Sequence, residues 1–225
     1  MGRADSLTDG DPGGVTEVAV QFRRALREAL QDDPEAFGLR DAALRSGERL
    51  VEALDGLRHR DPPMLRHLSA SQPADDFVRR FVAEVGGDGR LVVDAVTRRA
   101  ARQVAERLLA PDGPLADPTR PQRLTGELFC ALYQLFFGKL VGEFIHVLIA
   151  ENLKLAVPAL VLLDPTDMVA GLVADQVVRI LPNPCAHAAA QEPGRPPLVE
   201  AARELLTETV TQALGLDDTD LELAA

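Results

Sequence analysis

Glu143 and His146 have residue types and a spacing that match a known metal-binding pattern. They lie three positions apart in an apolar stretch of helical character, which places both side chains on one helix face. The Glu-x-x-His pair occurs in carboxylate-bridged di-iron bundles, where a second pair and two further glutamates complete the site. This chain has no second pair. We therefore expect Glu143 and His146 to belong to an exposed polar stripe that pairs with Lys139. The alternative is a ligand or metal site, whose missing half a symmetric dimer would supply.

Motifs of the common catalytic sites are absent from the sequence. The chain has no phosphate-binding glycine loop, no nucleophile elbow and no His-Glu-x-x-His helix. His59, His67 and His187 have no acid at metal-ligand spacing, and we expect them at the surface. We predict no catalytic residue, no bound metal and no cofactor, and we lean against an enzyme. A pair of carboxylates that meets only in the folded protein is the alternative.

The two cysteines have no spacing that resembles a zinc site or a redox motif. Cys130 lies in an apolar helical run and Cys185 in a proline-rich stretch. We expect both to be free thiols in a reducing compartment. The first residues also lack the basic start and apolar run of a secretory signal, so we predict a cytoplasmic protein.

The charge of the chain limits its partners. The net charge of −11 repels nucleic-acid backbones, so we expect no nucleic-acid partner. Two of the 24 basic residues are lysines and the rest are arginines, a bias that suggests a GC-rich bacterial genome. We expect a protein partner, a second copy of the chain, or both, and we do not expect a membrane to be the partner.

The apolar residues predict an all-α fold. They recur at helical spacing and almost nowhere alternate with a period of two, which favours an irregular bundle of about seven to nine helices around a central apolar helix. Helices are predicted over 16–33, 41–61, 73–85, 90–110, 164–181 and 197–214, besides an apolar segment over 124–163 and a proline-rich loop over 182–197.

Composition divides the chain into five parts. We predict a disordered leader (1–14), a charged amphipathic helical subdomain (15–110), a proline-rich linker (111–123), an apolar helical core (124–215) and an acidic flexible tail (216–225). The main internal boundary is expected in the linker, because it holds four prolines and has no apolar periodicity.

The segment 124–163 is the most apolar part of the chain. Charged residues interrupt it too often for a membrane span, so we predict the buried central helix of a bundle. Its polar residues form two stripes, one marked by Glu127 and Gln134 and the other by Lys139 and Glu143. Because the stripes change over at Gly138, we predict a kink, bulge or short break there.

Gly138 and Gly142 form a Gly-x-x-x-Gly pair, which gives a helix a flat strip that another backbone can approach. A crossing within the chain is the first interpretation of this strip. A homodimer seam around Gly138, Gly142 and Ile145 is the second, and it requires an exposed apolar surface there.

Together these patterns favour a cytoplasmic helical interaction or regulatory module that self-associates. The first alternative is a bundle that binds a small molecule or metal through Glu143 and His146 and could be an enzyme. The second is reversible membrane association through 124–163.

Overall fold

The protein is all-α, as predicted. The computed structural model describes residues 38–59, 62–156, 165–191 and 197–216, and every regular element in them is helical. The elements are α2 (Leu39–Gly56), the short 3₁₀ helix η2 (Pro63–Leu65), α3 (Pro73–Gly86), α4 (Val92–Leu109), α5 (Gly126–Ala156), α6 (Pro165–Ile180), α7 (Pro184–Ala190), α8 (Leu198–Glu204) and α9 (Leu206–Ala213). The helix predicted over 16–33, the leader and the acidic tail from 217 on lie outside the described residues.

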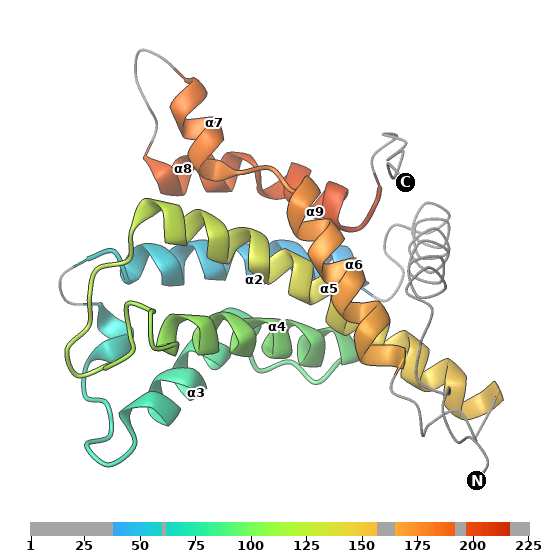
Figure 1. The fold of residues 1–225 in the computed structure, drawn as a ribbon, viewed down its shortest axis with the longest axis horizontal. Helices are drawn as coiled ribbons and strands as arrows, with labels where there is room; N and C mark the ends of the chain where they lie inside the picture. Colours follow the sequence, from blue (N-terminus) through green and yellow to red (C-terminus); the bar gives the residue numbers. More distant parts are fainter. Residues whose placement is uncertain (1–37, 60–61, 157–164, 192–196, 217–225) are drawn as a thin grey trace, which may run out of the picture.

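The long apolar helix α5 is the centre of the bundle. It contacts α2, α4, α6, α7 and α9, and its apolar side chains fill the core, including Tyr133, Phe136, Phe137 and Phe144. Figure 1 shows α3 and α4 on one side of α5 and the C-terminal helices α7 to α9 on the other. Helix α6 crosses α5. The prediction of a central apolar helix is confirmed.

Local signals explain most helix ends. Pro73 occupies the first turn of α3, and the helix ends at Gly87, whose φ of 67° suits glycine. The side chain of Asp94 accepts a hydrogen bond from the backbone N–H of Leu91 at 2.8 Å, which fixes the start of α4. The helix predicted over 41–61 begins two residues earlier, at Leu39, after Gly38 with a φ of 63°, and it ends at Gly56.

Helix α5 is continuous through Gly138, so the short break that was one of the predicted possibilities does not occur there. The two polar stripes meet different neighbours, and one continuous helix satisfies both. Gln134 donates a hydrogen bond to the carbonyl of Leu181 just beyond the end of α6 at 2.9 Å, whereas Glu143 faces α4. Gly138 serves a close contact with α6: a Cβ built there would lie 2.8 Å from the carbonyl oxygen of Ala174.

The C-terminal region has more helix breaks than its periodicity predicts. The loop predicted over 182–197 contains α7, which begins where the Asn183 side chain accepts hydrogen bonds from two backbone N–H groups. The single helix predicted over 197–214 is two helices, α8 and α9, separated at Leu205. The carbonyl of Ala202, which a continuous helix would bond to the next turn, lies 3.3 Å from the hydroxyl of Tyr133.

Residues on both sides of the proline-rich segment 111–123 pack into one core, which runs from Leu39 to Leu214. The segment itself contributes Leu115, which is buried and whose backbone N–H donates to the carbonyl of Leu108 at 3.0 Å. Leu124, just after the segment, is also in the core and donates to the carbonyl of Leu57 at 3.3 Å.

The first part of α5, Gly126–Val147, is long and apolar enough to cross a membrane by length and composition alone. Of its most apolar window, 67% is buried inside the bundle, as expected for the core helix of a folded domain. Membrane association through 124–163 stays a prediction.

Candidate functional site

A small polar groove lies where α4, α5 and α6 meet, and it includes both residues of the Glu-x-x-His pair. Its volume is about 220 Å³. The groove is lined by Gln103 of α4, by Lys139, Gly142, Glu143 and His146 of α5, and by Ala170, Gly171 and Ala174 of α6. The structure therefore brings the sequence-predicted polar residues together with a glutamine and a row of small residues from two other helices.

Glu143 is held by α4. Its Oε1 accepts a hydrogen bond from Nε2 of Gln103 at 2.7 Å, and Oε2 lies 3.6 Å from Nη1 of Arg99. The sequence predicted a pairing of this stripe with Lys139. The observed partners come from a helix about 40 residues away in the chain, and one-dimensional spacing does not reveal such a contact.

Lys139 contributes a positive charge that has no ion pair among the described residues. It is partly buried on the groove wall. His146 lies about two turns further along α5 on the same face. In the described part of the groove, Arg99 lies near Glu143 at 3.6 Å, whereas the charge of Lys139 has no such partner.

The walls of the groove are made of small residues, and the two glycines have different surroundings. A Cβ built on Gly142 would lie 2.9 Å from the carbonyl oxygen of Ala170 and 3.0 Å from the Cβ of Ala174. A Cβ built on Gly171 would have no neighbour within 4 Å. Gly142 is thus required for the approach of α5 to α6, whereas Gly171 borders open space.

The described residues do not assemble a metal centre at Glu143 and His146. Nowhere in the described ranges do three or more His, Cys, Asp or Glu side chains group closely enough to hold a metal ion. Of the two predicted ligands, Glu143 already has Gln103 as its hydrogen-bond partner.

The predicted interface residues lie inside the chain. Gly138, Gly142 and Ile145 are all buried, and α6 covers the two glycines through Ala170 and Ala174. The strip is used for a helix crossing within the chain, the first of the two sequence interpretations. A contact between two copies at these residues would need α6 to move away.

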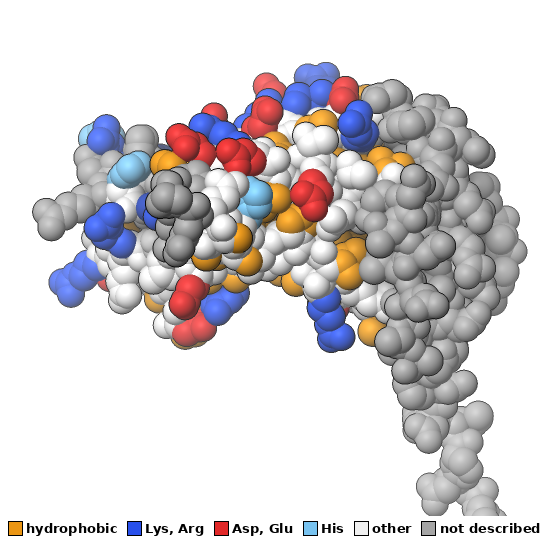
Figure 2. All heavy atoms as spheres, turned by 90° about the horizontal axis from the view of Figure 1, so that it is seen from above, with side chains coloured by type: hydrophobic (Ala, Val, Ile, Leu, Met, Phe, Trp, Pro, Cys, Tyr) orange, Lys and Arg blue, Asp and Glu red, His pale blue; other side chains and the backbone are white. Residues whose placement is uncertain are grey.

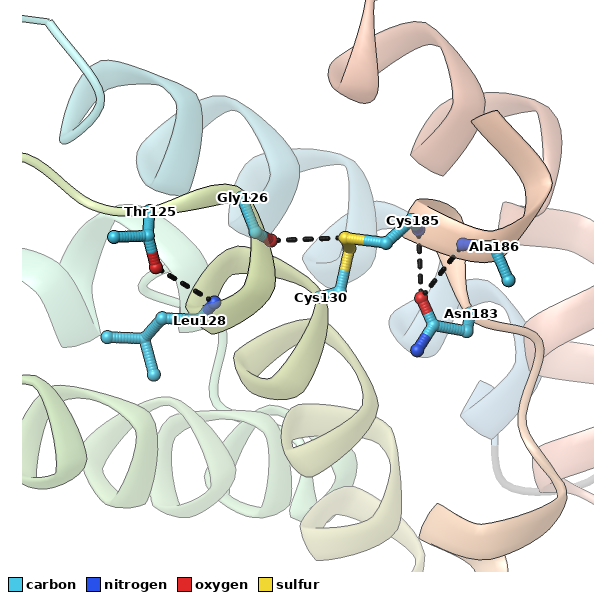
Figure 3. The surroundings of a disulfide bond; sticks show 7 residues. All are labelled: Thr125, Gly126, Leu128, Cys130, Asn183, Cys185 and Ala186. Carbon is cyan, nitrogen blue, oxygen red and sulfur yellow. Dashed lines mark hydrogen bonds between the residues drawn. A yellow bond between two sulfur atoms is a disulfide. The ribbon is translucent and has the colours of Figure 1, made fainter. Parts of the chain in front are cut away.

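Cys130 and Cys185 form a disulfide between α5 and α7 (Figure 3), so the prediction of two free thiols is wrong. The fold brings together two cysteines that are 55 positions apart, with their Cα atoms separated by 6.1 Å, within the range that a disulfide requires. Cys130 is buried, whereas Cys185 lines a cleft of about 750 Å³ together with Arg58, Thr125, Gly126, Glu127, Pro197 and Leu198. Spacing alone did not reveal this pairing.

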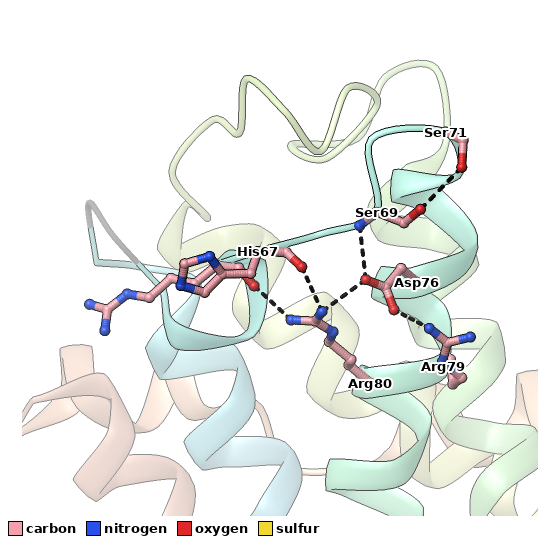
Figure 4. A network of polar contacts seen from close by, with 7 residues as sticks. His67, Ser69, Ser71, Asp76, Arg79 and Arg80 are labelled. Carbon is pink, nitrogen blue, oxygen red and sulfur yellow. Dashed lines mark hydrogen bonds and ion pairs between the residues drawn. The ribbon is translucent and has the colours of Figure 1, made fainter.

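A second polar cluster, centred on the buried carboxylate of Asp76, orders the loop before α3 (Figure 4). Asp76 accepts hydrogen bonds from the backbone N–H of Ser69 at 3.0 Å, from Arg80 at 2.9 Å and from Arg79. Arg80 also donates to the carbonyl of His67 at 2.8 Å, a residue with an unusual positive φ of 55°. The hydrogen bond from Ser69 and the two guanidinium groups lower the pKa of Asp76, although burial opposes them. We interpret this cluster as structural.

The surface seen in Figure 2 has red acidic and blue basic side chains interspersed with apolar ones. This face therefore has no extended patch of one charge.

No known protein-family model matches the chain, and neither a curated protein nor a solved structure is significantly similar to it.

Proposed function

We propose that the protein binds a small anionic molecule, a carboxylate of metabolite size, in the groove between α4, α5 and α6. The observation that carries this proposal is the cation of Lys139 on the wall of the groove, which is partly buried and has no ion pair with any residue that the structure describes. A cation in partly buried surroundings interacts more strongly with an anion than the same charge in water. The proposal corresponds to the ligand-binding alternative of the sequence analysis.

The dimensions of the groove restrict the ligand. Its volume of about 220 Å³ is below the roughly 300–1,000 Å³ of pockets that hold drug-sized molecules. The described side chains that α6 contributes are small, those of Ala170 and Ala174 besides Gly171, so a flat or short ligand can lie against them. Gln103 holds Glu143 and thereby keeps its negative charge directed toward α4. These features favour a short carboxylate over a nucleotide or a peptide.

Isothermal titration calorimetry with acetate, succinate, glutamate and inorganic phosphate tests the proposal. We expect saturable binding of at least one carboxylate and a loss of at least tenfold in affinity in Lys139→Gln. Arg102→Gln is the matched control, since Arg102 is exposed on α4 outside the groove and its substitution changes the net charge equally. Equal losses in the two variants, or no binding of any probe, would contradict the proposal.

A second candidate function, self-association, has its own observation. Leu91 and Val92 at the start of α4 are 67% and 52% exposed. Their loop is nevertheless well held, since Arg98 donates to the carbonyl of Gly89 at 2.7 Å and Asp94 fixes Leu91. Because the backbone at this corner is already ordered, a partner that binds there does not have to order it. We propose that this corner supports an interaction between two copies of the chain.

Sedimentation velocity over a range of concentrations tests the second candidate. We expect a dimer that the double substitution Leu91→Asp with Val92→Asp converts to a monomer. A monomeric wild-type protein at the highest concentration, or a dimer unaffected by the substitutions, would argue against self-association through this corner. The cytoplasmic location stays a prediction from the sequence.

A further inference from the structure

We propose that Cys185 is a site of covalent modification, at which a small zwitterionic aminothiol forms a mixed disulfide inside the cleft next to α5 and α7. This inference is independent of the groove at Lys139. It follows from the unequal surroundings of the two sulfur atoms of the disulfide.

The two sulfur atoms differ in access. Cys130 is 2% exposed and belongs to the hydrophobic core. Cys185 is partly buried, packs against the edge of that core and lines the cleft of about 750 Å³. Thiol–disulfide exchange requires the incoming thiolate to reach the sulfur that it attacks. The cleft gives that access at Cys185, and the core denies it at Cys130.

The exchange needs no other oxidant or reductant. The incoming thiolate attacks Sγ of Cys185 and forms a new sulfur–sulfur bond, and the bond between Cys185 and Cys130 breaks. The electron pair of the broken bond stays on Sγ of Cys130, which takes up a proton from water. One disulfide is consumed and one is formed, so the oxidation state of the system is unchanged.

The products fit the places that the structure offers them. A protonated Cys130 behaves as a small apolar side chain and can stay in the core. The adduct on Cys185 extends into the cleft, which is large enough for an amino acid. If a second thiol then releases Cys185 as a free thiol, its S–H has an acceptor in the carbonyl of Gly126, which lies 3.2 Å from Sγ (Figure 3).

The charges in the cleft indicate the class of thiol. Arg58 and Glu127 both line it. Arg58 also lies 3.6 Å from Asp55, a half-exposed pair that the carboxylate of a ligand would share, and Glu127 offers an opposite charge to the ammonium group. Thr125 adds a hydroxyl to the lining, and Leu198 adds apolar surface. Free cysteine is the simplest thiol with these groups and serves as the probe.

The first test uses the oxidised wild-type protein. It is incubated with L-cysteine at neutral pH, quenched with acid and analysed by peptide mass spectrometry. We expect the cysteinyl adduct on Cys185, with Cys130 recovered as a thiol. An adduct on Cys130, or an adduct that forms only after denaturation, would overturn the proposal.

A second test compares the two thiols without any variant. The wild-type protein is fully reduced, desalted and pulsed with iodoacetamide under native conditions, and circular dichroism confirms that the helices are retained. We expect Cys185 to be alkylated at least tenfold faster than Cys130, and the difference to vanish in urea. Equal native rates, or faster labelling of Cys130, would mean that the cleft does not control access.

The class of thiol is tested by comparing the exchange rates of a charged and an uncharged thiol. In Arg58→Gln, exchange with L-cysteine is expected to slow more than exchange with the uncharged thiol 2-mercaptoethanol. Equal slowing with the two thiols would overturn the assignment of the carboxylate to Arg58.

Discussion

Gly142 of α5 lies directly against the backbone carbonyl of Ala170 of α6, so that a Cβ at position 142 would stand 2.9 Å from that oxygen. One helical turn earlier, Gly138 makes the same kind of contact with Ala174, at 2.8 Å. These contacts bring α6 close to α5 and place Lys139 and His146 beside Gly171 in the groove. The spacing of two glycines thus determines the shape of the proposed binding site.

Gly142→Ala is expected to lower the free energy of unfolding by about 1–2 kcal/mol. Overpacking typically costs about 1–3 kcal/mol, and the better helix propensity of alanine returns up to about 1 kcal/mol. The variant has two close contacts to relieve, with Ala170 and Ala174. Urea unfolding followed by circular dichroism measures the change.

Gly171→Ala is the matched control, because it is the same substitution on the facing helix but its Cβ enters open space. We expect it to raise the free energy of unfolding by up to about 1 kcal/mol through helix propensity. If both variants were stabilised, the close contact of α5 with α6 would not be tight, and the description of the groove wall would be wrong.

Tyr133→Phe is expected to destabilise the protein by about 1 kcal/mol, the usual net value of one buried hydrogen bond. The hydroxyl of Tyr133 is buried and donates to Oγ1 of Thr209 at 2.8 Å, which connects α5 with α9. Combining it with Thr209→Val in a double-mutant cycle should give losses that are less than additive, because both changes remove the same bond. Fully additive losses would show that the two hydroxyls do not interact.

Because of the same tyrosine, we expect the free energy of unfolding to fall in alkali. Burial raises the pKa of Tyr133 above its usual value of about 10, so the folded state keeps the proton where the unfolded state loses it. The stabilisation is complete below about pH 10 and decreases as the pH rises above it. Unfolding experiments from pH 8 to 11 should show a stability difference between wild type and Tyr133→Phe that narrows at the alkaline end.

Asp76→Asn is expected to destabilise the protein at neutral pH and to have little effect in acid. The pKa of Asp76 is lowered in the folded state by the N–H of Ser69 and by its arginine partners, so the charged form stabilises the fold above the unfolded pKa of about 4. That contribution is lost as the pH falls through the folded pKa. Thermal unfolding at pH 7, 5 and 3 measures it.

Asp75→Asn provides the control for this prediction. Asp75 is exposed in the same first turn of α3, so its substitution removes the same charge near the helix N-terminus without the Asp76 contacts. A pH dependence shared by both variants would assign the effect to the helix dipole and would refute the role given to the network in Figure 4.

Reduction of the disulfide is expected to lower the free energy of unfolding by about 2–4 kcal/mol, the usual range for a native disulfide. The bond closes a loop between residues 55 positions apart, which restricts the unfolded chain. Chemical unfolding with and without a reductant measures the loss. A Cys130→Ala and Cys185→Ser double variant should not respond to the reductant.

The sequence predicted the helices well where the apolar period agrees with the residues that begin and end helices. Three signals correspond directly to observed helices: Pro73 and the glycines that bound α3, the period of apolar residues in α4, and the high apolar content of α5. Helix α7 was missed because prolines dominate its surroundings, although Asn183 followed by Pro184 is itself a helix-start signal.

The site was less predictable because its parts meet only in three dimensions. Glu143 and His146 were identified from their spacing, but Gln103 and Gly171 come from helices elsewhere in the chain. The pairing of Cys130 with Cys185 likewise depends on the position of α7 against the first turns of α5. The Gly-x-x-x-Gly spacing of Gly138 and Gly142 did indicate a close helix crossing, which the contacts with Ala174 and Ala170 of α6 provide. The partner helix itself and the contacts of Gln103 and Cys185 carry no signal in one-dimensional spacing.

The most direct test of the proposed ligand site is methyl NMR of alanine-labelled protein during titration with the tightest-binding carboxylate. Ala170 and Ala174 line the groove, and their methyl signals should shift with ligand in the wild type and remain unchanged at the same concentrations in Lys139→Gln. Shifts confined to alanines elsewhere, or shifts of Ala170 and Ala174 that persist undiminished without Lys139, would contradict the account.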